Sequence, residues 1–369
     1  MKISVITLQA IRNYGSALQT YATESILRGM GHDVETVNYI REAARIDSVR
    51  SICACHQSGY ATKLKQILLL PTTRRQKLVF DAFNQKYLHL TKQVYTYDED
   101  FNAQPIEADV YCTGSDQVWN TDWHGEIPKP FFLSYAPKEK KKIAFSASFG
   151  KETLAEWEKP GIKELLSRYD AISVREESAV QILEDLQLQG TWVLDPTLVA
   201  GRGTWETLAA PRQIAEDYVL VYQLGRDKAF NRYAKAYAKK HGLKLVRICM
   251  RLDHAFRPGK SVVIPTPEVV LSLFRHASCV ITDSFHATAF SLLFQRQFIC
   301  IYPRQFSTRL ESVLRLTGLQ ERHLTDYNDM DMGQRPIDYT RVDALLQAAR
   351  ERSLSFLQEA LSEVPYESE

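Results

Sequence analysis

The sequence lacks any apolar run long enough to cross a membrane, which takes about 20 residues. Its first residues, Met1 to Thr7, read as a strand and show no signal-peptide pattern. Neither sign of charge dominates, because 46 Lys and Arg residues against 44 Asp and Glu residues give a formal charge of +2. We therefore expect a cytoplasmic protein without a transmembrane span, and no general affinity for nucleic acid. Any anion-binding site must therefore be formed by a local group of residues and not by the overall charge of the protein.

Cysteine is also scarce, with six residues scattered along the chain. The one cluster, Cys53-Ala-Cys55-His56, lacks the second pair of ligands that a zinc site needs. The loop after the first strand contains a single glycine, Gly15, and not the GxGxxG pattern of a dinucleotide fold. We expect neither a bound metal ion nor a resident cofactor.

The 369 residues exceed the usual size of one core and predict two domains. Short apolar strands alternate with helical patterns, which is typical of Rossmann-like β/α domains. We expect an α/β fold in which two such domains face a cleft. The first domain covers residues 1–200 with a helical insertion at about 41–108, and the second covers residues 211–369. Helical patches are expected within the insertion over 61–70 and 75–87, and residues 171–174 and 192–197 are among the expected strands of the first domain. A linker over 199–216 joins them, and a long helix over 338–361 closes the second domain.

Polar residues follow the strands of both predicted domains, at the strands' carboxyl ends. In parallel sheets these ends meet at one edge, where ligands bind. His286 lies at such an end, on the first turn of a helix, with Ser284 and Thr288 beside it. A histidine here is suited to acid/base work or anion binding, and a structural histidine with Ser284 as a helix cap is the alternative.

Two arginines are candidates for binding an anion. Arg175 directly follows a strand at a helix start, where a cation gains nothing from the helix dipole. Arg309 follows Ser307 and Thr308 on a later helix. A guanidinium matches the geometry of a carboxylate or phosphate, although pairing of Arg175 with Glu176 or another acid is the plainer alternative.

The segment after another strand adds three candidates. Asp116, next to Ser115, is suited to accepting a proton from a sugar hydroxyl, or to capping the following turn. Trp119 and Trp123 are suited to stacking on a sugar ring, although packing is the commoner role of such residues. Near the amino terminus, Asn13 and Tyr14 are placed either to line the cleft or to shape the turn.

Taken together, these segments resemble the polysaccharide pyruvyl transferase family. Five motifs carry the resemblance, in this order: Asn13-Tyr14-Gly15 followed by Leu18-Gln19, Gly114-Ser-Asp-Gln-Val-Trp-Asn120, Ser173-Val-Arg-Glu-Glu-Ser178, Leu194-Asp-Pro-Thr197, and Thr282-Asp-Ser-Phe-His-Ala-Thr288.

The resemblance implies two domains of glycosyltransferase-B style, with the acceptor on the side of the first domain and the donor, phosphoenolpyruvate, on the side of the second. It further implies that the enzyme transfers a pyruvyl group from phosphoenolpyruvate to two hydroxyls of a sugar, in a surface polysaccharide or its lipid- or nucleotide-linked precursor. On this view His286 and Asp116 are catalytic, and the donor or sugar is bound by Arg175, Arg309, Ser284, Thr288, Asn13, Tyr14, Ser115 and Trp119. Some family members carry an arginine where this chain has Ser284; either another cation replaces it, with Arg309 the first candidate, or the donor is bound differently. Peripheral association with a membrane would fit a lipid-linked acceptor.

Two other functions fit the same pattern. A glycosyltransferase that uses a nucleotide sugar would place Arg175 and Arg309 on the diphosphate. A glycan-binding relative would keep the cleft but catalyse nothing.

Overall fold

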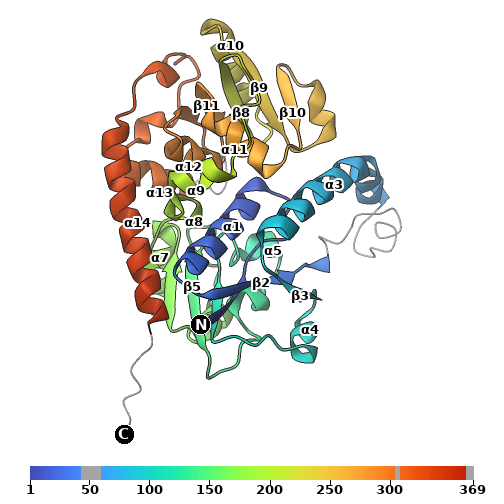
Figure 1. Ribbon diagram of the computed structural model, residues 1–369, viewed down its shortest axis with the longest axis vertical. Coiled ribbons are helices and arrows are strands. Elements are labelled where there is room, and N and C mark those ends of the chain that lie inside the picture. Colours follow the sequence, from blue (N-terminus) through green and yellow to red (C-terminus); the bar gives the residue numbers. More distant parts are fainter. Residues whose placement is uncertain (43–59, 304–307, 363–369) are drawn as a thin grey trace.

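The computed structural model describes residues 1–42, 60–303 and 308–362. Cys53, Cys55, His56 and Ser307 lie outside this part of the chain. Two parallel sheets, one above the other, form the centres of two domains (Figure 1). The chain therefore has the expected α/β fold with two Rossmann-like domains.

The N-terminal sheet has the strand order β3-β2-β1-β4-β5-β6-β7, and all of its strands are parallel. Its chain order reverses between β1 and β4, so the carboxyl ends of these strands flank a crevice where ligands bind in such sheets. Its strands are β1 (Lys2–Ile6), β2 (Asp33–Tyr39), β3 (Leu90–Tyr95), β4 (Val110–Thr113), β5 (Lys141–Ala147), β6 (Ala171–Val174) and β7 (Thr191–Trp192). The helices of this part are α1 (Tyr14–Gly29), α3 (Tyr60–Tyr87), α4 (Asp98–Ala103), α5 (Thr121–His124), η2 (Lys129–Phe132), α6 (Lys159–Leu166), α7 (Glu177–Asp185), α8 (Pro196–Val199) and α9 (Gly201–Leu208).

The C-terminal sheet repeats this design with the order β10-β9-β8-β11-β12, again all parallel. The reversal here lies between β8 and β11. Its strands are β8 (Tyr218–Tyr222), β9 (Lys244–Cys249), β10 (Lys260–Val263), β11 (Cys279–Thr282) and β12 (Gln297–Cys300). The accompanying helices are α10 (Lys228–Lys240), η3 (Leu252–Phe256), α11 (Pro267–Arg275), α12 (Phe285–Leu293), α13 (Thr308–Thr317), η4 (Gln320–Arg322), η5 (Met332–Gln334) and α14 (Tyr339–Leu361).

The expected helical insertion differs in two ways from the structure. Its two predicted helices are one helix, α3, which continues through Pro71. Strand β3 then joins the edge of the sheet beside β2, so the insertion is not wholly helical. Part of the predicted linker is also helical, since α9 occupies residues 201–208.

A buried apolar core is continuous between the domains. It includes Leu18 of α1, Leu198 of α8 and Phe290 of α12, together with residues from one face of each sheet. The other face of each sheet has a core of its own. This shared packing holds the carboxyl ends of the two sheets toward one another.

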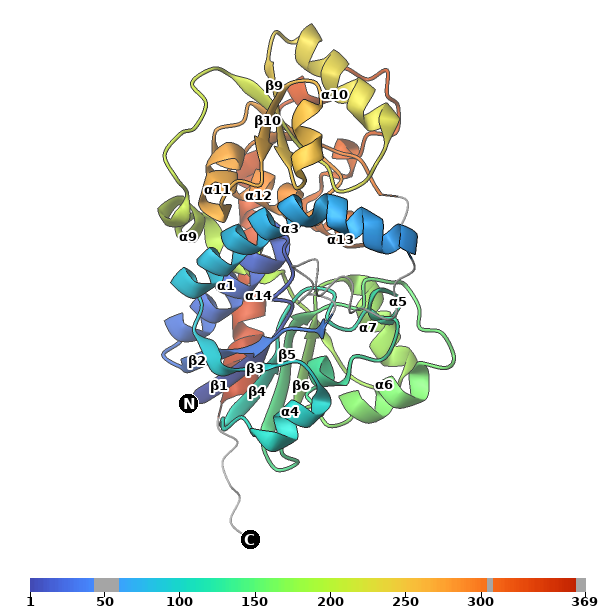
Figure 2. The ribbon, with the colours of Figure 1, turned by 90° about the vertical axis from the view of Figure 1, so that its right-hand side faces the viewer.

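Two long helices also join the domains. Helix α3 lies across the boundary (Figure 2), where Gln76 donates a hydrogen bond of 2.7 Å to the carbonyl oxygen of Met250. Helix α14 begins on the C-terminal domain, where Tyr339 bonds the backbone of Arg296. It ends on the N-terminal domain, where Ser353 Oγ accepts a hydrogen bond of 3.0 Å from the Leu194 amide. Among the residues that the structure describes, no helix has the length and hydropathy to span a membrane.

Candidate functional site

A pocket of about 340 Å³ opens between the carboxyl ends of the two sheets. Residues of the β1–α1 loop and the segment after β4 form its N-terminal wall. The opposite wall comes from the segments after β8, β11 and β12 and from α13. The pocket is lined by Leu8, Ile11, Asn13, Ser16, Asp116, Gln117, Trp123, Leu224, Gly225, Asp283, Ser284, Phe285, His286, Pro303, Arg309 and Leu310.

His286 lies on the first turn of α12, and 11% of its side chain is exposed. Its ring packs against the first turn of α1, where a Cβ atom added to Gly15 would lie 2.1 Å from Nδ1. Residue 15 must therefore be glycine for the imidazole to occupy this position. Ser284 is the N-cap residue of α12, but its side chain makes no capping hydrogen bond. The imidazole thus lies at the junction of two helix starts, one from each domain.

Asp195 is the acidic partner of this histidine. One of its oxygens, Oδ2, lies 3.6 Å from His286 Nε2 and accepts a 2.6 Å hydrogen bond from Arg175. The other, Oδ1, accepts hydrogen bonds from the backbone amide and hydroxyl of Thr197, because Asp195 caps the short helix α8. Burial acts to raise the pKa of Asp195, but His286 and Arg175 outweigh it and hold the pKa well below the ordinary value.

The sequence motif around Asp195 was part of the resemblance, but sequence reasoning did not select this residue for the site. The predicted strand over 192–197 obscured its role, since the structure ends β7 at Trp192 and begins α8 at Pro196. An Asp-Pro-Thr sequence at a strand's carboxyl end is a helix-cap signal that identifies this turn.

Arg175 lies beneath the pocket and not on its wall. Its side chain is fully buried and faces three carboxylates: Asp195 at 2.6 Å, Asp116 at 3.3 Å and Glu176 at 3.9 Å. Burial acts to lower its pKa, but these acids outweigh burial and raise it. The anion-binding role predicted for Arg175 is therefore replaced by salt bridges, the plainer of the two interpretations. Arg175 organises the acids behind His286.

Asp116 reaches the pocket from the segment after β4, with a backbone φ of 77°. Its Oδ2 accepts a 2.6 Å hydrogen bond from Ser16, and its Oδ1 accepts one of 3.3 Å from Arg175. Burial acts to raise its pKa, but Arg175, His286 and Arg309 together lower it. Asp116 is thus a weak base, which does not favour the predicted role as proton acceptor.

Arg309, on α13, contributes the one guanidinium among the described residues that line this pocket. Its NH1 atom lies 3.9 Å from Asp116 Oδ1, and its Nε is buried without a hydrogen-bond partner. Burial and the nearby charge of Arg175 lower its pKa to about 10, so it remains charged at neutral pH. Arg309 is therefore the cation available to an anionic ligand here.

The other predicted residues fall into two groups. Asn13 and Ser284 line the pocket, and Asn13 also caps α1 by accepting a 2.8 Å hydrogen bond from the Gly15 amide. Tyr14 does not line it, because its hydroxyl donates a 2.6 Å hydrogen bond to the Pro265 carbonyl across the domain boundary. Ser115 and Thr288 are fully buried behind the wall.

The two tryptophans differ, although the same two roles were considered for both. Trp119 is fully buried and stacks on Phe132 within the N-terminal core, so it is a packing residue and not a sugar platform. Trp123 is 46% exposed and lines the pocket. The segment 114–120 lines the pocket with Asp116 and Gln117 but turns Trp119 into the core, whereas α5 carries Trp123 outward to the pocket.

Acidic groups outnumber the cations of the site. Arg175 and Arg309 lie near Asp116, Glu176 and Asp195, and Asp283 also lines the pocket, so the formal charge is −2 while His286 is neutral and −1 when it is protonated. In the described part of the chain, no group of three or more His, Cys, Asp or Glu residues is arranged to hold a metal ion. The arrangement combines an acid/base histidine, its buried carboxylate and one cation at a single cavity.

Known proteins share both the sequence pattern and the fold. The sequence matches the family model for polysaccharide pyruvyl transferase over residues 13–304. A comparison with curated proteins gives no significant match. Similar solved structures include a putative UDP-N-acetylglucosamine 2-epimerase from Listeria monocytogenes, with 12% identity, a TM-score of 0.53, and coverage of 99% of this chain and 97% of that chain. The S. aureus MnaA–UDP structure shares 10% identity with a TM-score of 0.53, and each chain is covered fully.

At these identities the structural likeness concerns the fold alone, which is of the glycosyltransferase-B type. The family match shows more than the fold, because the matched residues make up most of the chain and include all five motifs. The chain therefore belongs to the polysaccharide pyruvyl transferase family, and this membership supports a role in polysaccharide pyruvylation.

Proposed function

We propose that this protein transfers the pyruvyl group of phosphoenolpyruvate to two hydroxyls of one sugar unit, forming a cyclic ketal on a surface polysaccharide or its precursor. Family membership supports pyruvylation, and the donor and the ketal are our proposal. The observation that carries it is the His286–Asp195 pair at a pocket that also presents Arg309. Acid/base chemistry and anion binding are thus available at one cavity.

The proposed reaction needs both acid/base chemistry and a site that binds an anion. Two sugar oxygens form bonds to C2 of phosphoenolpyruvate, and the bond from C2 to the phosphate oxygen breaks. The two hydroxyls release two protons. One proton is taken up by the methylene carbon, which becomes a methyl group, and the other leaves with inorganic phosphate. A residue that gives and takes protons near neutral pH is required, and histidine is the usual choice.

His286 fills this role in our proposal. Its protonated form delivers a proton to the methylene carbon, and its neutral form accepts one from a sugar hydroxyl. Asp195 stabilises the imidazolium by its charge, because it is ionised and lies 3.6 Å from Nε2, and close packing against Gly15 holds the ring in position. Asp116 holds Ser16 and Arg175 in place, and it is too weakly basic to compete for the proton.

The donor is a trianion and needs positive potential. Arg309 supplies a full charge on the pocket wall, and the first N–H groups of α12 supply partial positive charge beside His286. Ser284 adds a hydroxyl at the same helix start. On this proposal Arg309 and Ser284 together replace the arginine that some family members carry at residue 284.

The test is release of phosphate from phosphoenolpyruvate in the presence of a galactoside, in free, lipid-linked and nucleotide-linked forms. Mass spectrometry of the sugar should show the added carboxylated ketal. We expect His286→Ala to lose at least 100-fold in kcat, since general acid–base catalysis contributes about 10²–10⁴-fold. Unchanged turnover in this variant would contradict the proposed role of His286.

The rival function, transfer of a sugar from a nucleotide sugar, places both arginines on a diphosphate. Burial of Arg175 among three carboxylates disfavours this, because it leaves one cation on the wall. Supplying the protein with UDP-galactose or UDP-N-acetylglucosamine in place of phosphoenolpyruvate distinguishes the two. Glycosyl transfer without any ketal product would favour the rival, and an inert protein that still binds glycans would favour a non-catalytic relative.

A further inference from the structure

Exposed apolar side chains gather on two elements that contact each other. Eleven large hydrophobic side chains are exposed among the described residues, and five of these lie on α3 and η3. The five are Ile67, Leu68 and Leu78 of α3, and Leu252 and Phe256 of η3. The two elements meet where the Leu252 amide donates a 3.2 Å hydrogen bond to Thr72 Oγ1. A single exposed hydrophobic residue is ordinary, but a group on adjoining elements indicates a surface that binds a partner.

The outward face of α3 combines apolar and basic side chains. Ile67, Pro71, Arg74 and Leu78 follow one another at intervals of three or four residues, which places them on one side of the helix. All four are exposed, and Leu78 is 67% exposed. Arg75 adds a second exposed guanidinium beside this row. The helix lies across the front of the molecule in Figure 2. An exposed helix face of this composition is typical of a helix that lies on a membrane surface or on a partner.

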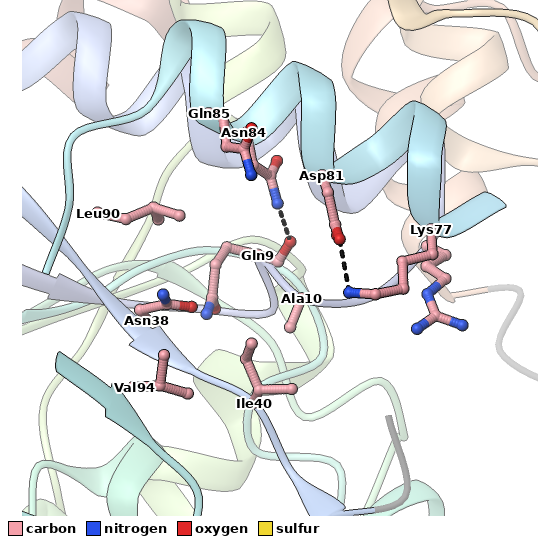
Figure 3. A pocket seen from close by; sticks show the side chains of 11 residues that line it. Gln9, Ala10, Asn38, Ile40, Lys77, Asp81, Asn84, Gln85, Leu90 and Val94 are labelled. Carbon is pink, nitrogen blue, oxygen red and sulfur yellow. Dashed lines mark hydrogen bonds and ion pairs between the residues drawn. The ribbon is translucent and has the colours of Figure 1, made fainter. Parts of the chain in front are cut away.

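The other side of α3 attaches to the N-terminal domain. There Asn84 donates a 3.0 Å hydrogen bond to a carbonyl of the β1–α1 loop (Figure 3). Lys77 pairs with Asp81 at 2.6 Å, so its charge is compensated within the helix (Figure 3). Arg74 and Arg75 form no ion pair with any residue that the structure describes. Their charges are therefore available to a ligand outside the protein.

The segment around η3 is basic as well. Arg257 donates a 3.1 Å hydrogen bond to His254 Nε2. Burial lowers the pKa of His254, and the charges of Arg257, Arg251 and Arg226 lower it further against the opposing charge of Asp253. Three guanidinium groups therefore lie around one imidazole. Of the three, only Arg251 is in an ion pair with a described residue, Asp253 at 2.7 Å, so this segment has a net positive charge.

The aromatic ring of Phe256 projects from this basic segment. It is 93% exposed and directly precedes Arg257. Leu252, at the other end of η3, is 39% exposed. At the boundary region of a bilayer, apolar side chains enter between the lipids while neighbouring arginines meet the phosphate groups. The surface of α3 and η3 supplies both halves of this contact.

Two other partners fit this surface less well. A nucleic acid would engage the arginines and stack on Phe256, but it would leave the aliphatic side chains of Ile67, Leu68 and Leu78 in water. A second copy of this chain would bring arginines against arginines. The phosphates and acyl chains of lipids match both the charge and the apolar residues, so the surface favours an anionic membrane.

This surface begins at the rim of the candidate functional site. Leu224 and Gly225 line the pocket there, and Arg226 follows them directly. Leu224 is itself 52% exposed. We propose that the exposed residues of α3 and η3, together with Arg226, dock the protein on an anionic membrane. Resting on the proposed function, this docking presents a lipid-linked saccharide at the pocket.

The test measures binding of the full-length protein to vesicles in the absence of phosphoenolpyruvate. The vesicles consist of phosphatidylcholine alone or mixed with phosphatidylglycerol, and bound protein is measured by co-sedimentation. We expect binding to the anionic vesicles that weakens with added salt, and little binding to the neutral ones. One arginine at an anionic surface contributes about fivefold in affinity, so Arg74→Gln/Arg75→Gln should bind roughly 20-fold more weakly. Leu78→Ser/Phe256→Ser should bind about tenfold more weakly, because less apolar surface enters the bilayer.

Matched controls change the same residue types elsewhere. Arg341→Gln/Arg352→Gln removes two exposed arginines from α14, which lies on the opposite side of the molecule (Figure 1). Trp157→Ser removes an aromatic ring that is 62% exposed and belongs to neither α3 nor η3. Both control variants should bind the vesicles like the wild type. The melting temperature of each variant checks that it is folded.

Four outcomes would overturn the proposal: no binding of the wild type to anionic vesicles, undiminished binding of both folded surface variants, equal weakening in the control variants, or retention on heparin that exceeds vesicle binding and is unaffected by Leu78→Ser/Phe256→Ser. The last of these would mark a site for a soluble polyanion. Vesicle binding as expected together with no phosphate release from phosphoenolpyruvate would refute the proposed function and leave the membrane surface standing. Phosphate release with a soluble saccharide but no vesicle binding would do the reverse.

Discussion

Gly15→Ala should reduce catalysis strongly while leaving the protein folded. The added Cβ would lie 2.1 Å from His286 Nδ1, whereas ordinary contacts begin at 3.4 Å, so the ring must move by roughly 1.3 Å. The clash is with a side chain that can rotate, and alanine favours a helix over glycine by about 1 kcal/mol. We therefore expect little change in melting temperature, because the two effects on stability oppose each other.

The effect on turnover should be much larger. A misplacement of about 1 Å at a catalytic group costs around 100-fold in rate, or about 2.7 kcal/mol of transition-state stabilisation. Movement of the ring also disturbs the 3.6 Å ion pair of His286 with Asp195. The measurement is kcat/KM for phosphate release from phosphoenolpyruvate with a saccharide acceptor, alongside the melting temperature.

Gly29→Ala is the matched control. Gly29 is the last residue of the same helix, and an added Cβ there meets nothing within 4 Å. It should leave both activity and the position of His286 unchanged. If Gly15→Ala were as active as Gly29→Ala, the location of the imidazole against α1 would have no bearing on catalysis, and the proposed role of His286 would be refuted.

Four further predictions concern the charged groups. Arg309→Ala should raise KM for phosphoenolpyruvate at least tenfold with little loss of stability, and an unchanged KM would remove Arg309 from the donor site. Asp195→Asn should lower kcat by about 100-fold or more, because the imidazolium loses its buried counter-charge, and a normal kcat would contradict the pairing. Arg175→Ala should destabilise the fold by about 3–5 kcal/mol, because three carboxylates lose their buried partner, and an unchanged melting temperature would contradict this. The pKa of Asp116 in the folded protein lies below the ordinary value of about 3.9, so the unfolded state binds the proton more readily. The stability that ionised Asp116 gives the folded protein is therefore lost as the pH falls through the folded-state pKa. The difference in melting temperature between wild type and Asp116→Asn should accordingly shrink on acidification from pH 6 toward pH 3, and a constant difference would argue against it.

The fold was largely predictable because its signals are local. The strand at 171–174 was predicted with its observed bounds, and the predicted helix over 338–361 differs from α14 by one residue. Residues 61–70 and 75–87 were predicted as separate helical patches, whereas the structure has one helix that continues through Pro71. The edge strand β3 was missed because residues 90–95 are only partly buried and carry no clear alternation.

The site was less predictable because its partners are distant in sequence. The position of His286 followed from the strand and helix pattern, and the structure places it on the pocket wall as expected. The neighbours of Arg175 did not follow, since Asp116 precedes it by 59 residues and Asp195 follows it by 20. No local pattern reports that three carboxylates converge on one guanidinium, so the choice between binding an anion and forming a salt bridge required coordinates.

The main chain passes between the domains at residues 209–217 and again along α14. Together with the continuous apolar core, these two covalent crossings hold the two sheets in one relative position. His286 and Asp195 come from different domains, so their 3.6 Å separation depends on that packing. A substitution that loosens the domain boundary would therefore act on the acid/base pair without contacting either member of it.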